Sequence, residues 1–117
     1  MKRPLAYITA AWSGNILKDR DRAVNYCRSA YEAGFSLIYP ILYMPLFINS
    51  GIPEEHKSAV DMGRDLLRRS HVLAVCGKSI DESVKNDIAT AARLRITATT
   101  LDGIIALKAH GKVNPND

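Results

Sequence analysis

Val72-Leu73-Ala74-Val75-Cys76 is an uninterrupted run of apolar residues, as expected of a β-strand that is buried on both faces of a sheet. A helical spacing of apolar residues follows over residues 82–94, and a second strand is predicted over residues 96–99. A strand, a helix and another strand in this order predict two parallel strands joined by a right-handed crossover. This unit indicates an α/β protein.

The rest of the chain continues the same alternation. The expected elements are strands over residues 5–9 and 35–39, a packed loop over residues 41–51, and helices over residues 19–33, 53–69 and 101–109. This order predicts a single-domain, doubly wound (Rossmann/flavodoxin-like) three-layer sandwich with a parallel sheet of four to five strands. We expect the domain to span residues 1–112, with Gly111 ending the last helix, and a polar C-terminal tail to span residues 113–117.

The 117-residue chain is mildly basic, with 16 Lys and Arg against 12 Asp and Glu. The basic residues are dispersed, and the densest group, Arg64, Arg68 and Arg69, has no aromatic residues interleaved with it. This pattern favours a solvated helix face over a nucleic-acid site. A mildly basic protein can still prefer phosphorylated small ligands.

The ends, cysteines and histidines narrow the class of protein. Nothing at the N-terminus resembles a signal peptide, and the apolar stretch Leu37–Ile48 is too short to span a bilayer. Cys27 and Cys76 are expected as buried thiols in a reducing compartment. The three histidines share no metal-ligand spacing. The sequence therefore predicts a cytoplasmic protein with no metal or cofactor and no nucleic-acid or membrane partner.

Doubly wound sheets bind ligands beyond the carboxyl ends of their strands, which predicts a site built by residues 10–18, 40–52 and 77–82. All eight aromatic residues lie within the first 47 residues of the chain. The aromatic residues expected to form one wall of the site are Tyr7, Trp12, Tyr43 and Phe47. Those expected in the core are Tyr26, Tyr31 and Phe35.

Two carboxylates are expected on the opposite wall. Asp87 borders the buried stripe formed by Val84, Ile88 and Ala91 on the third helix, so its carboxylate loses solvation unless it is paired. Alternatively, Asp87 leans outward and pairs with a basic residue. Asp81 precedes the same helix, where the plain explanation is an N-cap. Together the two form the carboxylate pair that cleavage of a glycosidic bond requires.

The turn after the first strand offers a further clue. Trp12 adjoins Ser13-Gly14-Asn15, a turn that is expected to be exposed, so its ring is available to stack on a base. Gly14 alone is weak evidence for phosphate binding, because the chain lacks the G-x-G-x-x-G and P-loop spacings. Nicotinamide dinucleotides and ATP hydrolysis are therefore disfavoured.

Three segments resemble the nucleoside 2-deoxyribosyltransferase-like superfamily, including its short bacterial and phage members. The first is Tyr7-Ile8-Thr9-Ala10-Ala11-Trp12. The second runs from Asp81 to Asp87-Ile88 and Ala91, and the third is the pattern Gly77-x-x-Ile80-x-x-Ser83-Val84. The similarity spans about residues 5–109.

The resemblance implies roles for particular residues. Asp87 stands where the family has its nucleophilic Glu, Asp81 assists at the base, and Tyr7 orients the Asp87 carboxylate. The resemblance also implies a further acid from the helix before the third strand, for which Asp65 and Asp61 compete. The other residues that we expect to bind the substrate are Trp12, Gly14, Tyr43, Gly77 and Ser83.

The chain also departs from the family pattern. Asp87 is one methylene shorter than Glu, Ser83 replaces a glycine, and His71 replaces an acid before the third strand. In the family a neighbouring subunit's C-terminal region completes the pocket, and only Asn114 and Asn116 are candidates for that role here.

These features lead to one expected function and two alternatives. The expected function is a nucleoside- or nucleotide-binding protein, a hydrolase or glycosyltransferase acting on the N-glycosidic bond, in a homodimer or higher homo-oligomer. One alternative is a catalytically silent module that senses or sequesters a nucleotide. The other is a small dimeric adaptor of a mobile element that uses the Leu37–Ile48 stretch as its interface.

Overall fold

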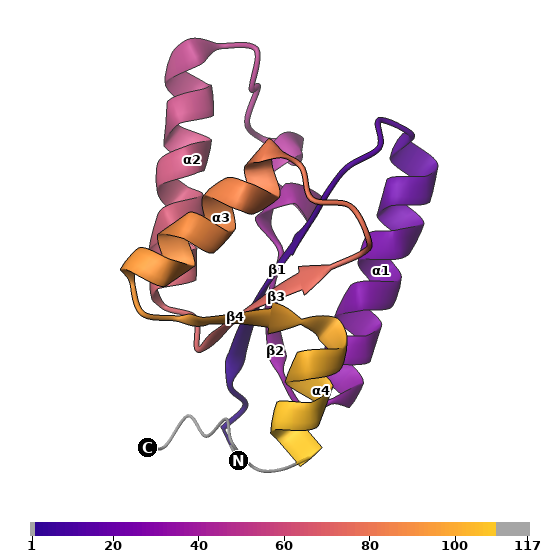
Figure 1. Ribbon diagram of the computed structural model, residues 1–117. Coiled ribbons are helices and arrows are strands. Elements are labelled where there is room, and N and C mark those ends of the chain that lie inside the picture. The colour runs from indigo at the N-terminus through magenta and orange to yellow at the C-terminus, as the bar shows by residue number, and fades with distance from the viewer. Residues whose placement is uncertain (1, 110–117) are drawn as a thin grey trace.

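The computed structural model describes residues 2–109 (Figure 1). Its elements follow the predicted order and are β1 (Leu5–Ala10), α1 (Ile16–Glu32), β2 (Ser36–Ile38), the 3-10 turns η1 (Pro40–Leu42) and η2 (Met44–Leu46), α2 (Pro53–Arg68), β3 (Val72–Cys76), α3 (Glu82–Arg93), β4 (Thr97–Thr100) and α4 (Leu101–Ala109). The predicted end at Gly111, the tail 113–117, Asn114 and Asn116 lie outside the described residues.

The four strands form one sheet in the order β2-β1-β3-β4, and every pairing is parallel. Chain connections from the central pair run in opposite directions, since β1 leads to β2 at one edge and β3 leads to β4 at the other. The predicted doubly wound α/β sandwich is therefore confirmed. It also places the change of direction between β1 and β3.

Helices cover both faces of the sheet. Figure 1 shows α1 and α4 on one side of it and α2 and α3 on the other, and each pair is in contact. Alternate residues of β1 feed the two cores: Ala6 and Ile8 pack in the core beneath α1 and α4, whereas Tyr7 packs with Leu67, Leu73 and Ala91 on the opposite face. Thr9 has the same parity as Tyr7 and is also buried.

Helix α1 begins at Ile16, three residues before the predicted start at Asp19. The reason is a cap: Asn15 has extended backbone geometry, and its side chain accepts a hydrogen bond from the backbone N–H of Lys18. Asp19 thus falls inside the first turn of the helix. It is 4% exposed.

Two expectations about the aromatic and apolar residues were wrong in part. Phe35 is buried as predicted, but Tyr31 is 52% exposed, with the guanidinium groups of Arg3 and Arg28 about 5 Å from its ring. The loop after β2 is held over the sheet by buried Pro40 and Met44, whereas its aromatic and aliphatic tip is open to solvent.

Among the described residues, no helix combines the length and the apolar character that crossing a membrane requires.

Candidate functional site

A pocket of about 690 Å³ opens at the carboxyl ends of β1 and β3. This is the place where the strand order changes direction, and where open α/β sheets bind ligands. Its walls come from the β1–α1 loop, the β3–α3 loop and one side of α1. The lining residues are Ala11, Trp12, Ser13, Arg22, Tyr26, Cys76, Gly77, Lys78, Ser79, Ile80 and Asp81. Loops 10–18 and 77–82 thus contribute as expected, but loop 40–52 does not line this pocket. The expected aromatic wall is therefore wrong in part: Trp12 lines the pocket, whereas Tyr7, Tyr43 and Phe47 do not.

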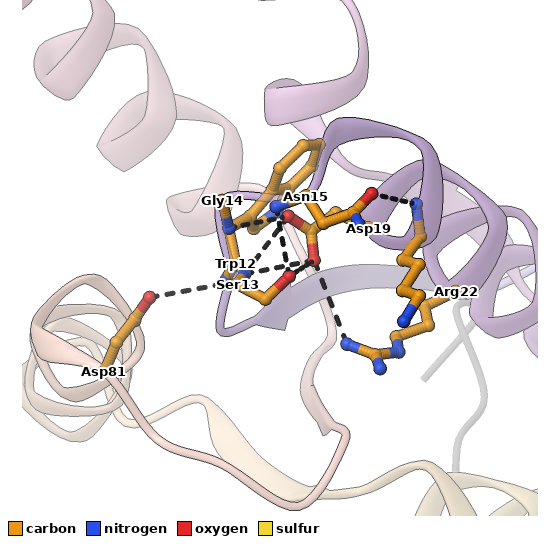
Figure 2. A network of polar contacts seen from close by, with 8 residues as sticks. Trp12, Ser13, Gly14, Asn15, Asp19, Arg22 and Asp81 are labelled. Atoms are coloured by element: carbon orange, nitrogen blue, oxygen red, sulfur yellow. Dashed lines mark hydrogen bonds and ion pairs between the residues drawn. The ribbon is translucent and has the colours of Figure 1, made fainter.

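Hydrogen bonds to the carboxylate of Asp19 fix the conformation of the β1–α1 loop (Figure 2). It accepts hydrogen bonds from the backbone N–H of Ser13 at 3.0 Å and of Gly14 at 3.1 Å, and from the Ser13 hydroxyl at 2.8 Å. These donors lower the pKa of Asp19, the Ser13 backbone N–H most of all. The amide donors of Ser13 and Gly14 in this loop are therefore already occupied by the Asp19 carboxylate of α1.

Asp81 joins the two sides of the pocket. Its Oδ1 accepts from the backbone N–H of Val84 at 2.9 Å, which is the N-cap of α3 that the sequence suggested as the plain explanation. Its Oδ2 accepts from the backbone N–H of Trp12 at 3.4 Å, a long contact across the pocket mouth (Figure 2). Asp81 thus caps α3 firmly and makes only a weak contact with the β1–α1 loop.

Asp87 points toward the sheet rather than toward open solvent. Its Oδ2 accepts a 2.6 Å hydrogen bond from the hydroxyl of Thr9, a buried residue of β1. Burial raises the pKa of Asp87, the Thr9 hydrogen bond opposes that rise, and the charge of Asp81 adds to it. The alternative in which Asp87 pairs with a basic residue is not realised among the described residues.

Tyr7 lies on the same face of β1 as Thr9. Burial raises the pKa of its hydroxyl well above the usual tyrosine range, and the charge of Asp87 and the neighbouring Tyr43 contribute further. A Cβ built on Gly63 of α2 would stand 3.3 Å from the Tyr7 hydroxyl oxygen, so this glycine makes room for the ring. The structure therefore gathers Tyr7, Thr9 and Asp87, with Asp81 close enough to act on the same carboxylate.

The remaining predicted residues lie in several places. Gly77 lines the pocket in a left-handed conformation, with φ +83°. Gly14 has φ +93° and donates to Asp19, and Ser83 is exposed in the first turn of α3. Asp65 is not brought to the cluster: it is exposed on α2 and forms an ion pair with Arg68 at 3.4 Å. Its competitor Asp61 is exposed as well.

Five residues of the site were not predicted from the sequence. Thr9 could have been identified, because it is the polar residue at the end of an apolar strand and alternation places it on the same face as Tyr7. Asp19 carried the signal of an acid in a first helical turn. The other three line the pocket: Arg22, Tyr26 and Lys78. Arg22 and Lys78 carried no signal because they are exposed cations of ordinary type, and Tyr26 was expected only as a core residue, against which it does pack.

Within the described part of the chain, no group of three or more His, Cys, Asp or Glu side chains is placed to hold a metal ion. The polar groups of the pocket are instead suited to an organic ligand. Two aromatic rings, two cations and a carboxylate surround one cavity.

Two comparisons bear on this arrangement. No curated protein matches the chain with significance. The family model described as Domain of unknown function (DUF7768) matches residues 4–101, which include β1, the pocket loops and α3. The chain therefore belongs to the DUF7768 family.

Proposed function

We propose that this protein binds a nucleoside or nucleotide at the carboxyl edge of its sheet and cleaves or transfers at the N-glycosidic bond through Asp87. The observation that carries the proposal is the Thr9–Asp87 hydrogen bond of 2.6 Å, which aims a half-buried carboxylate at the end of β1. A carboxylate in such surroundings is typical of a reacting group more than of a surface residue. The resemblance of the flanking segments to nucleoside 2-deoxyribosyltransferase-like proteins supports the same reaction.

The proposed chemistry combines Asp87, which does not itself line the pocket, with Trp12 and Asp81, which do. The Asp87 carboxylate attacks C1′ of the sugar, the C1′–N bond breaks, and its electron pair goes to the base nitrogen, which takes up a proton. Water or a second base then displaces Asp87 from C1′. Trp12 offers an aromatic face for the base, and Oδ2 of Asp81 is the freer oxygen for a contact with the base, because Oδ1 is held by α3.

The test is to incubate the protein with a panel of nucleosides and nucleotides and to measure released base by chromatography. Asp87→Asn should abolish release while the protein stays folded. Asp21→Asn, which neutralises an exposed acid of α1, is the matched control and should keep full activity. Release that survives Asp87→Asn would refute the assignment of Asp87.

One observation favours a second candidate, a silent nucleotide-binding module. Asp87 is one methylene shorter than the Glu of the resembling family, and Thr9 holds it close to the sheet. A displacement of about an ångström at a reacting group can cost about 10²-fold in rate. Under this alternative a nucleotide stabilises the protein, by about 2.7 kcal/mol at 100 times its Kd, and no base is released.

A further inference from the structure

The two loops that face each other across the pocket differ in their unused hydrogen-bond donors. In the β1–α1 loop, the N–H groups of Ser13 and Gly14 are occupied by the Asp19 carboxylate. In the β3–α3 loop, the backbone N–H groups of residues 78–80 make no hydrogen bond to any other described residue. An anionic ligand group therefore finds donors on the β3–α3 side and a competing carboxylate on the other.

Two cationic side chains stand at the same pocket. Lys78 is exposed, and no carboxylate of the described residues lies within ion-pairing distance of it. Arg22 reaches the pocket from α1 and keeps only a loose pairing, 3.9 Å from Nη1 to Oδ1 of Asp19. The Asp19 carboxylate is buried and already accepts hydrogen bonds from Ser13 and Gly14, whereas the Arg22 side chain is 56% exposed. Most of the guanidinium donors consequently remain available to a ligand.

Charge is distributed unevenly around the pocket mouth. Figure 2 shows Arg22 and Asp81 approaching the turn at residues 12–14 from opposite sides. Asp81 is also the residue that acts electrostatically on Asp87. A ligand with one anionic end is therefore oriented, with its anion toward Arg22 and Lys78 and its other end toward Asp81, the one carboxylate among the residues that line the pocket.

We infer that the ligand carries a phosphate, and that Arg22, Lys78 and the backbone of residues 78–80 bind it. This inference rests on the proposed function and narrows it: the substrate class is a nucleoside monophosphate rather than a nucleoside. The phosphate at one end and the sugar C1′ at the other span the pocket from its cationic to its acidic side. The β1–α1 loop does not bind the phosphate, because the Asp19 carboxylate occupies its Ser13 and Gly14 N–H groups and repels an anion.

The experiment compares matched ligands on matched variants. Isothermal titration measures Kd for a nucleoside and for its 5′-monophosphate, for several bases, with inorganic phosphate as a third probe. The variants are Arg22→Ala, Lys78→Ala, the double variant, and Arg20→Ala as a control that removes an exposed cation of α1 outside the pocket lining. Circular dichroism confirms that each variant is folded.

We expect the monophosphate to bind at least about tenfold more tightly than the nucleoside, since bonds to charged groups are the stronger ones. Arg22→Ala and Lys78→Ala should each weaken the monophosphate by about tenfold and leave the nucleoside unchanged. Arg20→Ala should change neither. Raising the salt from about 0.05 M to about 0.5 M should weaken only the monophosphate.

Three other results would overturn the inference, and they separate it from the proposed function. Equal affinity for nucleoside and monophosphate, or a phosphate preference that survives the double variant, refutes the phosphate subsite and leaves the proposed function standing. Binding of neither ligand at millimolar concentration refutes both.

Discussion

Replacing Asp81 by Ala tests whether this residue is a structural cap, a catalytic group or both. In the structure, Oδ1 caps α3 through a well-formed 2.9 Å bond to Val84, whereas the 3.4 Å contact of Oδ2 with Trp12 is too long to add much. Loss of an N-cap costs about 1 kcal/mol. For a chain of this length that corresponds to a fall in Tm of about 4 °C. Thermal and urea denaturation measure both quantities.

Asp81→Asn is the matched control, because Asn caps helices about as well as Asp and retains the acceptor oxygen. We expect it to keep the free energy of unfolding within about 0.5 kcal/mol of the wild type. It should also lower the pKa of Asp87, since the charge of Asp81 raises that pKa. If Asp81 handles the proton on the base, Asp81→Asn abolishes base release in a protein of unchanged stability. An Asp81→Ala variant as stable as the wild type, or an Asp81→Asn variant as unstable as Asp81→Ala, would refute the capping argument.

Three further substitutions have defined outcomes. Thr9→Val should raise the pKa of Asp87 further, because the Thr9 hydrogen bond opposes burial; NMR titration of the carboxyl carbon measures it. In the window between the usual aspartate pKa and the raised one, the folded chain binds more protons than the unfolded chain, so the free energy of unfolding falls as the pH rises, and Thr9→Val should deepen that fall in pH-dependent denaturation. Gly77→Ala should lower the free energy of unfolding by about 1–2 kcal/mol, because φ is +83° and a Cβ would lie 2.9 Å from the Tyr26 hydroxyl oxygen. Arg95→Gly should raise it by about 0.5 kcal/mol, because Arg95 has φ 58° and glycine relieves that strain at some cost in entropy; urea denaturation measures both changes.

Each of these has a control in the same chain. Thr9→Ser keeps the hydroxyl and should leave the pKa of Asp87 close to its wild-type value; a shift as large as that of Thr9→Val would contradict the role of the hydrogen bond. Gly14→Ala is the control for Gly77→Ala, because Gly14 also has a left-handed φ, +93°, but no atom stands within 4 Å of the added Cβ. Equal falls in the free energy of unfolding for Gly14→Ala and Gly77→Ala would show that the contact with Tyr26 has no cost. Arg95→Ala, which keeps the strain, should bring no gain.

The fold was predictable because its signals are local and repeated. The apolar run Val72–Cys76 and the helical spacings around it specify strands and helices directly, and the alternation of types then fixes parallel pairing. The start of α1 was missed because Asn15, and not the later Asp19, provides the cap. Both residue types cap helices, and the sequence alone does not rank them.

The site was predictable only in part, because its key contacts join distant segments. The sequence placed Asp87 at the border of a buried stripe, but its partner Thr9 is 78 residues away and is specified by how α3 crosses β1. Arg22 and Lys78 gave no pattern at all, since an exposed cation becomes informative only when a cavity beside it is known. Tyr31 was expected in the core because it follows the helical spacing of the apolar residues. That spacing alone did not reveal that its ring lies at the surface beside the Arg3 and Arg28 side chains.

The Asp19 contacts also affect how tightly any ligand can be held. A loop that is already fixed by hydrogen bonds from Ser13 and Gly14 loses little conformational entropy when a ligand arrives. One wall of the pocket is thus preorganised, and the entropic cost of binding falls on the side chains of Arg22 and Lys78 and on the loop that follows β3. Substitutions that stiffen that loop without touching the ligand are therefore the most direct way to increase affinity.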